Sequence, residues 1–210
     1  MSPTRRLGTV AVAALLSMAL TATPAIALNG ITPAGHTAKF ISTGAAFTAT
    51  FGEKAPVKIT VGCSSSITGG TIPNPLALTM SIEAPTFNNG GGSTECASSA
   101  TVEANEVNGK WALTENALTQ GTITIPEAGL RVNIGSCSWT YAPTGAANLT
   151  QANNWTNGTS AMAPSQLKLA NVTVSARGTG GCPGALVSAT VSFIYTVIDQ
   201  TEPEAPVKFT

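Results

Sequence analysis

Apolar and polar residues alternate along much of this chain with a period of two. In the clearest run, "VSATVSFIYTV" over residues 187–197, the odd-numbered side chains are apolar and most even-numbered ones are Ser or Thr. Shorter runs cover residues 47–51 and 57–63. This period is typical of β-strands with one buried face. Ile194 and Ile198 interrupt the polar side of the longest run, so we expect that outer face to be partly covered.

Turn residues separate these runs at intervals typical of a β protein. Asn-Gly pairs recur along the chain, and glycine and asparagine both tolerate the positive φ of tight turns. The stretch "TVEANEVNGKWALTE", residues 101–115, predicts a hairpin with Asn108-Gly109 at its tip. Only "WALTENAL", residues 111–118, is compatible with a turn or two of helix. The sequence predicts an all-β fold, a disulfide-stabilised antiparallel β-sandwich or barrel.

One order of features occurs twice: a strand, a cysteine, a loop, a Pro-x-x-Leu-x-Leu strand, a second cysteine and an Ala-Thr-Val strand. The first copy contains "VKITVGCSSS", "PNPLALTMSI" and "ECASSATVEA", and the second "VNIGSCSWTY", "PSQLKLANVT" and "GCPGALVSATVSF". This order predicts two related units, about 40–118 and 119–200, within a secreted domain of residues 28–210. Chance similarity in a chain rich in strand patterns is the alternative, and length does not distinguish one domain from two.

In the segment "VNIGSCSWTY", residues 132–141, the alternation of apolar and polar positions shifts by one residue. Ile134 and Cys137 would lie on opposite faces of one regular strand. An extra residue at Gly135-Ser136 would return them to the same face. We therefore predict a single strand over residues 130–141 with a β-bulge at Gly135-Ser136.

The first 27 residues have the pattern of a signal peptide. Two arginines precede an apolar stretch over residues 10–20, and "AIA" at residues 25–27 is a small-residue cleavage signal. We expect export by the general secretory route and cleavage before Leu28. The apolar stretch is too short for a stable membrane span. Residues 1–27 are thus predicted as a signal peptide, and the mature chain as free of any membrane span.

Four cysteines follow the predicted cleavage site: Cys63, Cys96, Cys137 and Cys182. In an exported chain an even number of cysteines indicates disulfides, and three pairings are possible. We favour Cys63–Cys96 and Cys137–Cys182, because this pairing closes each unit with its own bridge. A zinc site is the alternative, but the chain has no C-x-x-C pair and a single histidine, His36. We expect no metal.

Charged residues are sparse. After residue 27 the chain has eight Lys and Arg against ten Asp and Glu, a net charge of −2, and the basic residues form no cluster. Nucleic-acid binding requires clustered basic residues, so no nucleic-acid partner is expected. Charged residues make up only 10% of the chain, so Ser, Thr, Asn and Gly must solvate the surface.

Catalytic patterns are absent from the sequence. A hydrolytic triad would have to use His36 with Asp199, yet there is no G-x-S-x-G motif, and we expect His36 to be a solvent-exposed loop residue. The sequence contains no nucleotide-binding motif, so we expect no cofactor. Glutamates remote in sequence can form a glycosidase pair. The candidates for such a pair, which we expect to be solvated surface residues, are Glu103, Glu106, Glu115 and Glu127.

Aromatic residues are the remaining candidates for ligand contacts. Trp111, Trp139, Tyr141 and Trp155 could form a carbohydrate-stacking platform, or they could be core residues. Trp155 has only polar neighbours in "NNWTNGTS" and is the candidate ligand contact that we expect to be exposed.

Three stretches together resemble a known group of proteins. "VGCSSSITGGTIP", "IGSCSWTYA" and "GGCPGALVSATVSFIYTV" resemble secreted actinobacterial all-β proteins of uncharacterised function. The resemblance implies export and a β fold, and it brings no catalytic residues. We expect a secreted or cell-envelope-associated, non-catalytic β protein with a structural or interaction role, whose partner is an envelope or extracellular protein or a glycan. A carbohydrate- or lipid-binding module is the alternative, and a hydrolase with dispersed glutamates is a third hypothesis.

Overall fold

The computed structural model describes residues 28–142, 147–151 and 154–210. Apart from the short 3-10 helix η1 (Ala97–Ser99), the regular elements in these residues are strands. The strands are β1 (Ile31–Thr32), β2 (Thr37–Ser42), β3 (Ala45–Phe51), β4 (Val57–Cys63), β5 (Ser65–Thr71), β6 (Thr79–Ile82), β7 (Thr86–Asn88), β8 (Thr101–Ala104), β9 (Trp111–Ala117), β10 (Gln120–Ile125), β11 (Leu130–Ile134), β12 (Cys137–Tyr141), β13 (Ala147–Gln151), β14 (Trp155–Thr156), β15 (Ser165–Thr173), β16 (Ala176–Gly180), β17 (Leu186–Asp199) and β18 (Lys208–Phe209).

A long bent hairpin forms one side of the largest sheet. Strand β3 pairs with β4, and β2, which precedes β3, pairs with β5, which follows β4. One arm bends at Thr43-Gly44 and the other at Ser64. Beyond β5 the sheet continues through β6, β9, β10 and β13, whereas β4 pairs with β3 alone among the described residues. The sheet is therefore wide in one half of the molecule and ends at β4 in the other.

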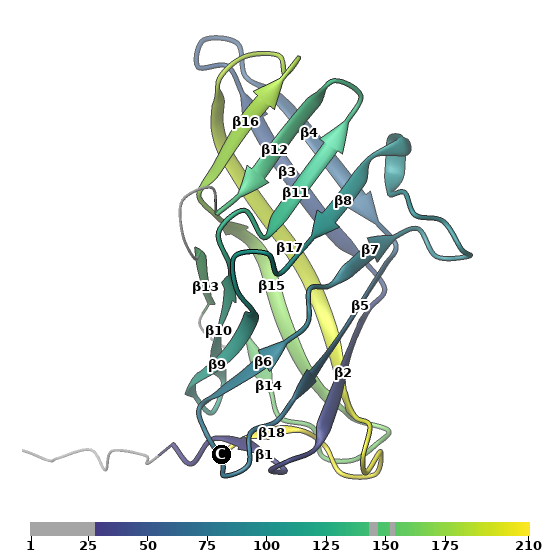
Figure 1. Cartoon of the computed structure of the whole chain (residues 1–210), viewed down its shortest axis with the longest axis vertical. Helices are drawn as coiled ribbons and strands as arrows, with labels where there is room; N and C mark the ends of the chain where they lie inside the picture. Colours follow the sequence, from purple (N-terminus) through teal and green to yellow (C-terminus); the bar gives the residue numbers. More distant parts are fainter. Residues whose placement is uncertain (1–27, 143–146, 152–153) are drawn as a thin grey trace, which may run out of the picture.

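Strand β17 joins the two halves. It pairs with β15 along one side, and along its other side with β3 over residues 186–193 and with β2 over residues 196–199. Figure 1 shows β17 running diagonally along the length of the molecule. The odd-numbered residues from Ala189 to Asp199 are buried, as the period-two pattern predicts up to residue 197. The strand thus contributes one continuous face to the core of both halves.

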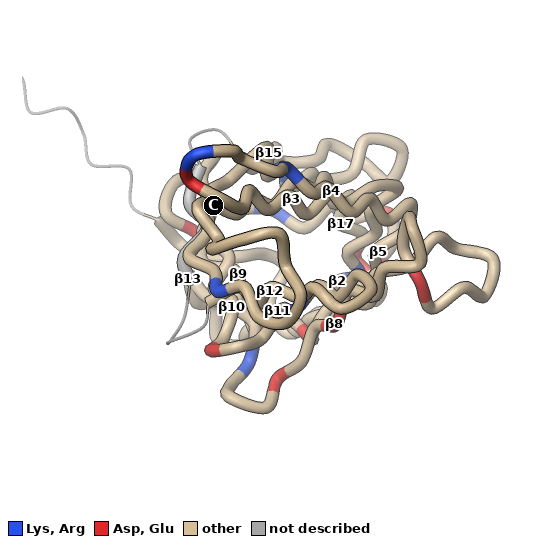
Figure 2. Tube along the Cα trace, turned by 90° about the horizontal axis from the view of Figure 1, so that it is seen from above, with Lys and Arg blue, Asp and Glu red and all other residues tan. Residues whose placement is uncertain are grey.

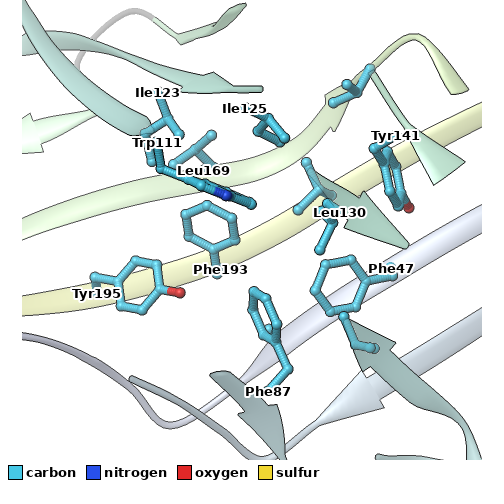
Figure 3. Close-up of a cluster of buried hydrophobic side chains, with 14 of the residues drawn as sticks. Phe47, Phe87, Trp111, Ile123, Ile125, Leu130, Tyr141, Leu169, Phe193 and Tyr195 are labelled. Carbon is cyan, nitrogen blue, oxygen red and sulfur yellow. The ribbon is translucent and has the colours of Figure 1, made fainter. Parts of the chain in front are cut away.

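A second sheet covers the upper half. Its strand order is β16-β12-β11-β8, and these strands lie in front of β3 and β4 in Figure 1. Rings of the two layers meet in the core, with Phe47 6.2 Å from Tyr141 and Phe51 6.1 Å from Trp139 between ring centroids. Seen from above, the strands of both sheets, among them β2, β17, β11 and β12, surround the middle of the molecule (Figure 2). Core side chains fill the interior, and Figure 3 shows part of this cluster.

The predicted fold class and both predicted disulfides are confirmed. Cys63, the last residue of β4, is bonded to Cys96 before η1, with their Cα atoms 4.6 Å apart. Cys137, the first residue of β12, is bonded to Cys182 beyond β16, with Cα atoms 4.4 Å apart. Each bridge fastens a strand to a neighbouring loop. The common origin of the two units stays a prediction, and their strands are interleaved in one large sheet.

The predicted bulge at Gly135-Ser136 is wrong. Residues 130–141 form two strands, β11 and β12, with these two residues as the turn between them. Ile134 pairs directly with Cys137, so the two side chains share a face because the chain reverses. Gly135 has φ of 54°, a left-handed conformation that glycine adopts easily.

Two further predictions for residues 101–118 are wrong. Strands β8 and β9 do not pair with each other: β8 pairs with β11, and β9 pairs with β6 and β10. The Asn108-Gly109 segment instead carries the chain from the four-stranded sheet to the large one. The stretch 111–118, considered as a helical turn, contains β9. Its alternating burial from Trp111 to Glu115 shows that tertiary packing, and not helix propensity, determines this segment.

Candidate functional site

Four isoleucines interrupt the polar outer face of the large sheet. Ile194 and Ile198 lie on the outward side of β17, Ile41 on β2 and Ile67 on β5. Ile41 pairs with Ile67 on one side and with Thr196 on the other, which places Ile194 and Ile198 diagonally across from Ile41, on either side of Thr196. Ile194 is 47% exposed and Ile67 40%. We call this set the isoleucine patch; Ile41 and Ile198 are partly buried, whereas Ile67 and Ile194 are exposed.

The remaining outer face is mainly hydroxylated. One row of threonines crosses four neighbouring strands, since Thr48 pairs with Thr60 and Thr190, and Thr190 pairs with Thr173. The Thr48 and Thr60 hydroxyls are 3.0 Å apart and hydrogen-bonded. Hydroxyls therefore supply the solvation that charged residues supply in most proteins, and the isoleucine patch contrasts with its surroundings.

Two connected hollows lie on this face. The first, which we call the bend cleft, has a volume of about 400 Å³ and is lined by residues 42–46, 168–170 and 192–194. The second, the isoleucine hollow, has about 440 Å³ and is lined by Ile41, Thr43, Gln166, Ile194, Thr196 and Ile198. Thr43 and Ile194 line both, so the hollows are continuous. Volumes of this size are those of small-molecule sites.

The bend cleft lies where the hydrogen-bond ladder is interrupted. Strand β17 passes from β3 to β2 between Phe193 and Thr196, opposite the bend at Thr43-Gly44. The Ser42 hydroxyl donates to the Gly44 carbonyl and accepts from the Gly44 N–H, at 2.6 and 3.2 Å, which fixes the bend. On the other side of β17, the register of β15 shifts between Leu169 and Val172. The cleft is therefore built by backbone irregularities on both sides of a regular strand.

One charged side chain lines these hollows. Lys168 lines the bend cleft, and no Asp or Glu lines either hollow. The ion pairs of the described residues are His36–Asp199 and Lys110–Glu106, so Lys168 belongs to neither. Its exposed ammonium group therefore remains available to an anionic group bound in the cleft.

Trp155 is not the exposed residue that the sequence predicted. Its side chain is 1% exposed and its ring stacks on Phe209, with centroids 4.0 Å apart and planes 5° from parallel. The indole N–H donates to Asn157 Oδ1 at 2.7 Å, and that oxygen also accepts from the Phe209 N–H at 2.8 Å. The polar neighbours of Trp155 bind it to the C-terminal strand, so polarity along the chain did not indicate exposure.

The other candidate aromatic residues are also in the core. Trp111, Trp139 and Tyr141 are each at most 2% exposed. Figure 3 shows Trp111 and Tyr141 among the buried side chains around Phe193 and Phe47. These residues offer no stacking platform on the described surface.

The four candidate glutamates differ in their surroundings. Glu106 accepts from the Ala84 N–H and from Lys110, which lowers the pKa of its carboxyl group, chiefly through the Lys110 hydrogen bond. Glu103 is exposed on β8 and Glu127 follows β10. Glu115, by contrast, is 1% exposed on β9, and burial raises its pKa. The expectation of a solvated surface residue is therefore wrong for Glu115.

His36 lies in the loop before β2, as predicted, but it is only partly exposed to solvent. Its Nδ1 donates to Asp199 Oδ2 at 2.8 Å, and the side chain is 19% exposed. The Asp199 carboxylate is buried and also accepts from the N–H groups of Thr201 and Glu202, at 2.8 and 3.0 Å. The pair thus fastens the start of β2 to the turn after β17. Asp199 continues the series of buried odd-numbered residues of β17. The predicted run ended at residue 197, so the alternation was not used to predict that Asp199 is buried.

Neither a metal centre nor a bilayer-spanning helix is found in the part of the chain that the structure describes. No three His, Cys, Asp or Glu side chains of residues 28–142, 147–151 and 154–210 are grouped closely enough to hold a metal ion. Within the same ranges no helix has the length and apolar character needed to cross a membrane.

Comparisons of the chain with protein-family models, with curated proteins and with solved structures find no match.

Proposed function

We propose that this chain is an exported, non-catalytic β protein that acts by binding a partner outside the cell or in the cell envelope. The observation that carries the proposal is the isoleucine patch, an exposed apolar surface on an otherwise hydroxylated sheet face. Contiguous exposed apolar side chains mark interaction surfaces in soluble proteins. The resemblance to secreted actinobacterial proteins agrees with this role.

Two observations support export. The two disulfides are of the kind that persists in oxidising compartments and is rare where thiols are kept reduced. The leader pattern of residues 1–27, which lies outside the described residues, is the second.

The absence of catalysis is part of the proposal. The His36–Asp199 pair has the first two members of a hydrolytic triad, but the hydrogen bonds of the described residues include none from a Ser or Thr hydroxyl to His36. The buried Glu115 lies on the core face of β9 and away from the open hollows. In a protein that only binds a partner, His36, Asp199 and Glu115 have structural roles.

A lipid-binding role is the second candidate. The bend cleft and the isoleucine hollow favour it over carbohydrate binding, because their linings are mostly apolar, the aromatic lining residue Phe193 is 5% exposed and the described tryptophans are buried. Carbohydrate sites commonly present an aromatic face to the sugar, and these hollows present none of the tryptophans.

Envelope retention of the exported protein tests the proposed function. Ile194→Asp combined with Ile67→Asp places two charges on the isoleucine patch at exposed positions, so the variant should fold with both disulfides intact. We expect the wild-type protein in the envelope fraction of the producing cells and the double variant mostly in the medium.

The matched control is Val107→Asp, which adds a charge at an 85% exposed valine in a loop outside the patch. It should be distributed between envelope and medium as the wild type is. Equal release of the double variant and the wild type would contradict the proposal.

A further inference from the structure

The bend cleft and the isoleucine hollow together form one trough along β17. They meet at Thr43 and Ile194, and the trough extends from Ser192 to Ile198 on the outward side of the strand. Leu169, Phe193 and Ile194 contribute apolar atoms at one end, and Ile41 and Ile198 do so at the other. An elongated apolar trough on a strand suits an extended alkyl chain better than a compact ligand.

A lysine lies beside the trough at each end, but only one of the two lines a hollow. Lys168 pairs with Ile194 and lines the mostly apolar bend cleft, whereas Lys39 pairs with Ile198 on β2 and lines neither hollow. Since no carboxylate lines either hollow and Lys168 forms no ion pair in the described residues, an anionic group is complementary to the end at Lys168. An anion at one end and an apolar trough behind it define the chemistry of an amphiphile.

We propose that the trough binds the anion of a long-chain fatty acid, with its carboxylate at the Lys168 ammonium and its chain along Ile194 toward Ile198. The assignment rests on the proposed function, since it names the ligand of the surface through which the protein is proposed to act. The carboxylate gains a charge-assisted contact, and the chain covers isoleucine side chains that are otherwise exposed to water.

Titration with dodecanoate, below its micellar concentration and followed by backbone amide NMR, tests this assignment. We expect saturable shifts at residues of β2, β15 and β17 that line the trough. Tetradecanoate should bind more tightly than dodecanoate by up to about fourfold per added methylene. Dodecanol and dodecyltrimethylammonium, which have the chain without the anion, should bind more weakly than dodecanoate.

Two substitutions in the bend cleft each have a matched control on the same sheet face. Lys168→Glu should weaken dodecanoate binding at least tenfold, whereas Lys58→Glu, on β4 and outside both hollows, should not. Ala46→Trp should fill the bend cleft and thereby weaken dodecanoate binding. Thr48→Trp, two residues further along β3, should leave dodecanoate binding unchanged. Circular dichroism and intact disulfides establish that each variant is folded.

The outcomes separate this assignment from the proposed function. Equal affinities for dodecanoate and tetradecanoate would overturn the fatty-acid assignment. An unchanged dodecanoate affinity in the Lys168→Glu variant would do so as well. If light scattering shows that the trough is instead covered by a second copy of the chain, the assignment also fails. Loss of envelope retention in the Ile67, Ile194 double variant without any dodecanoate binding would leave the proposed function supported and the fatty-acid assignment refuted.

Discussion

Two buried carboxylates show how much the surroundings of one residue decide. Asp199 accepts three hydrogen bonds, from the His36 ring and from two backbone N–H groups. Both oxygens of Glu115 are buried and accept no hydrogen bond of normal geometry, although the backbone N–H groups of Thr210 and Gly30 offset part of the burial cost. A satisfied buried carboxylate stabilises its surroundings, whereas an unsatisfied one is destabilising.

Glu115→Gln should therefore stabilise the protein at neutral pH. Burial raises the pKa of Glu115, so the folded state binds its proton more tightly than the unfolded state does. Stability is then lost as the pH rises from the ordinary carboxyl pKa through the raised one, by about 1.4 kcal/mol for each unit of difference. The variant lacks this loss. Urea unfolding should show a gain at pH 7 that disappears near pH 3, and a gain equal at both pH values would contradict the explanation.

Asp199→Asn should destabilise the protein, because the amide oxygen can still accept from the N–H groups of Thr201 and Glu202 but the amide nitrogen cannot accept from the His36 ring N–H. Removing one partner from a buried network of this kind costs about 1–3 kcal/mol. A double-mutant cycle with His36→Gln isolates the coupling between the two side chains by urea unfolding. Additive effects of the two substitutions would show that the His36–Asp199 contact contributes nothing of its own.

At the scale of the element, period-two patterns located strands well and chain reversals poorly. The long strand over residues 187–197 was predicted with its buried face, which is correct from Ala189 onward, whereas Val187 is 53% exposed. The β11–β12 turn was not, because a bulge and a two-residue turn change the parity of the side chains in the same way. The partners of β8 and β9 were also mispredicted, since strand pairing depends on residues remote in sequence. Trp155 lies against Phe209, more than fifty residues further along the chain, which no local pattern reveals.

Gly180→Ala should disrupt the end of the β12–β16 pair. A Cβ at this position would lie 2.2 Å from the Ser136 carbonyl oxygen, and Gly180 also has φ of 79°. Gly135→Ala, in the neighbouring turn, serves as control because its φ is positive too but a Cβ there meets open space. We expect a loss of about 1 kcal/mol for Gly135→Ala, from backbone strain alone, and a larger loss for Gly180→Ala. Thermal unfolding compares them, and equal losses would exclude the steric contribution.

At the scale of the whole molecule, the two disulfides fasten strands with different positions in their sheets. Cys63 belongs to β4, which pairs only with β3 among the described residues, whereas Cys137 begins β12, which pairs with β11 and β16 on its two sides. The cysteine spacing and the repeated order of features were enough to predict both bridges. The isoleucine patch was anticipated at Ile194 and Ile198, but Ile41 and Ile67 join it only through strand pairing.

Replacing either cysteine pair by alanine should lower the free energy of unfolding by about 4 kcal/mol, because the closed loops span 33 and 45 residues. Guanidinium unfolding of Cys63→Ala with Cys96→Ala, and of Cys137→Ala with Cys182→Ala, measures each bridge separately. Wild-type protein treated with a reductant should resemble the combined variant. A loss below about 1 kcal/mol for either pair would contradict the chain-entropy account.

The position of β17 in the chain determines when the fold can be completed. This strand is the only described partner of β3 on the side away from β4, and it also pairs with β2 and β15, all of which are synthesised before it. Until the ribosome has added residue 199, the apolar faces of β2 and β3 lack the strand that joins the two halves. Pairing over such long sequence separations is slow to form. The nascent chain should therefore stay unfolded, and dependent on chaperones, until β17 has been synthesised.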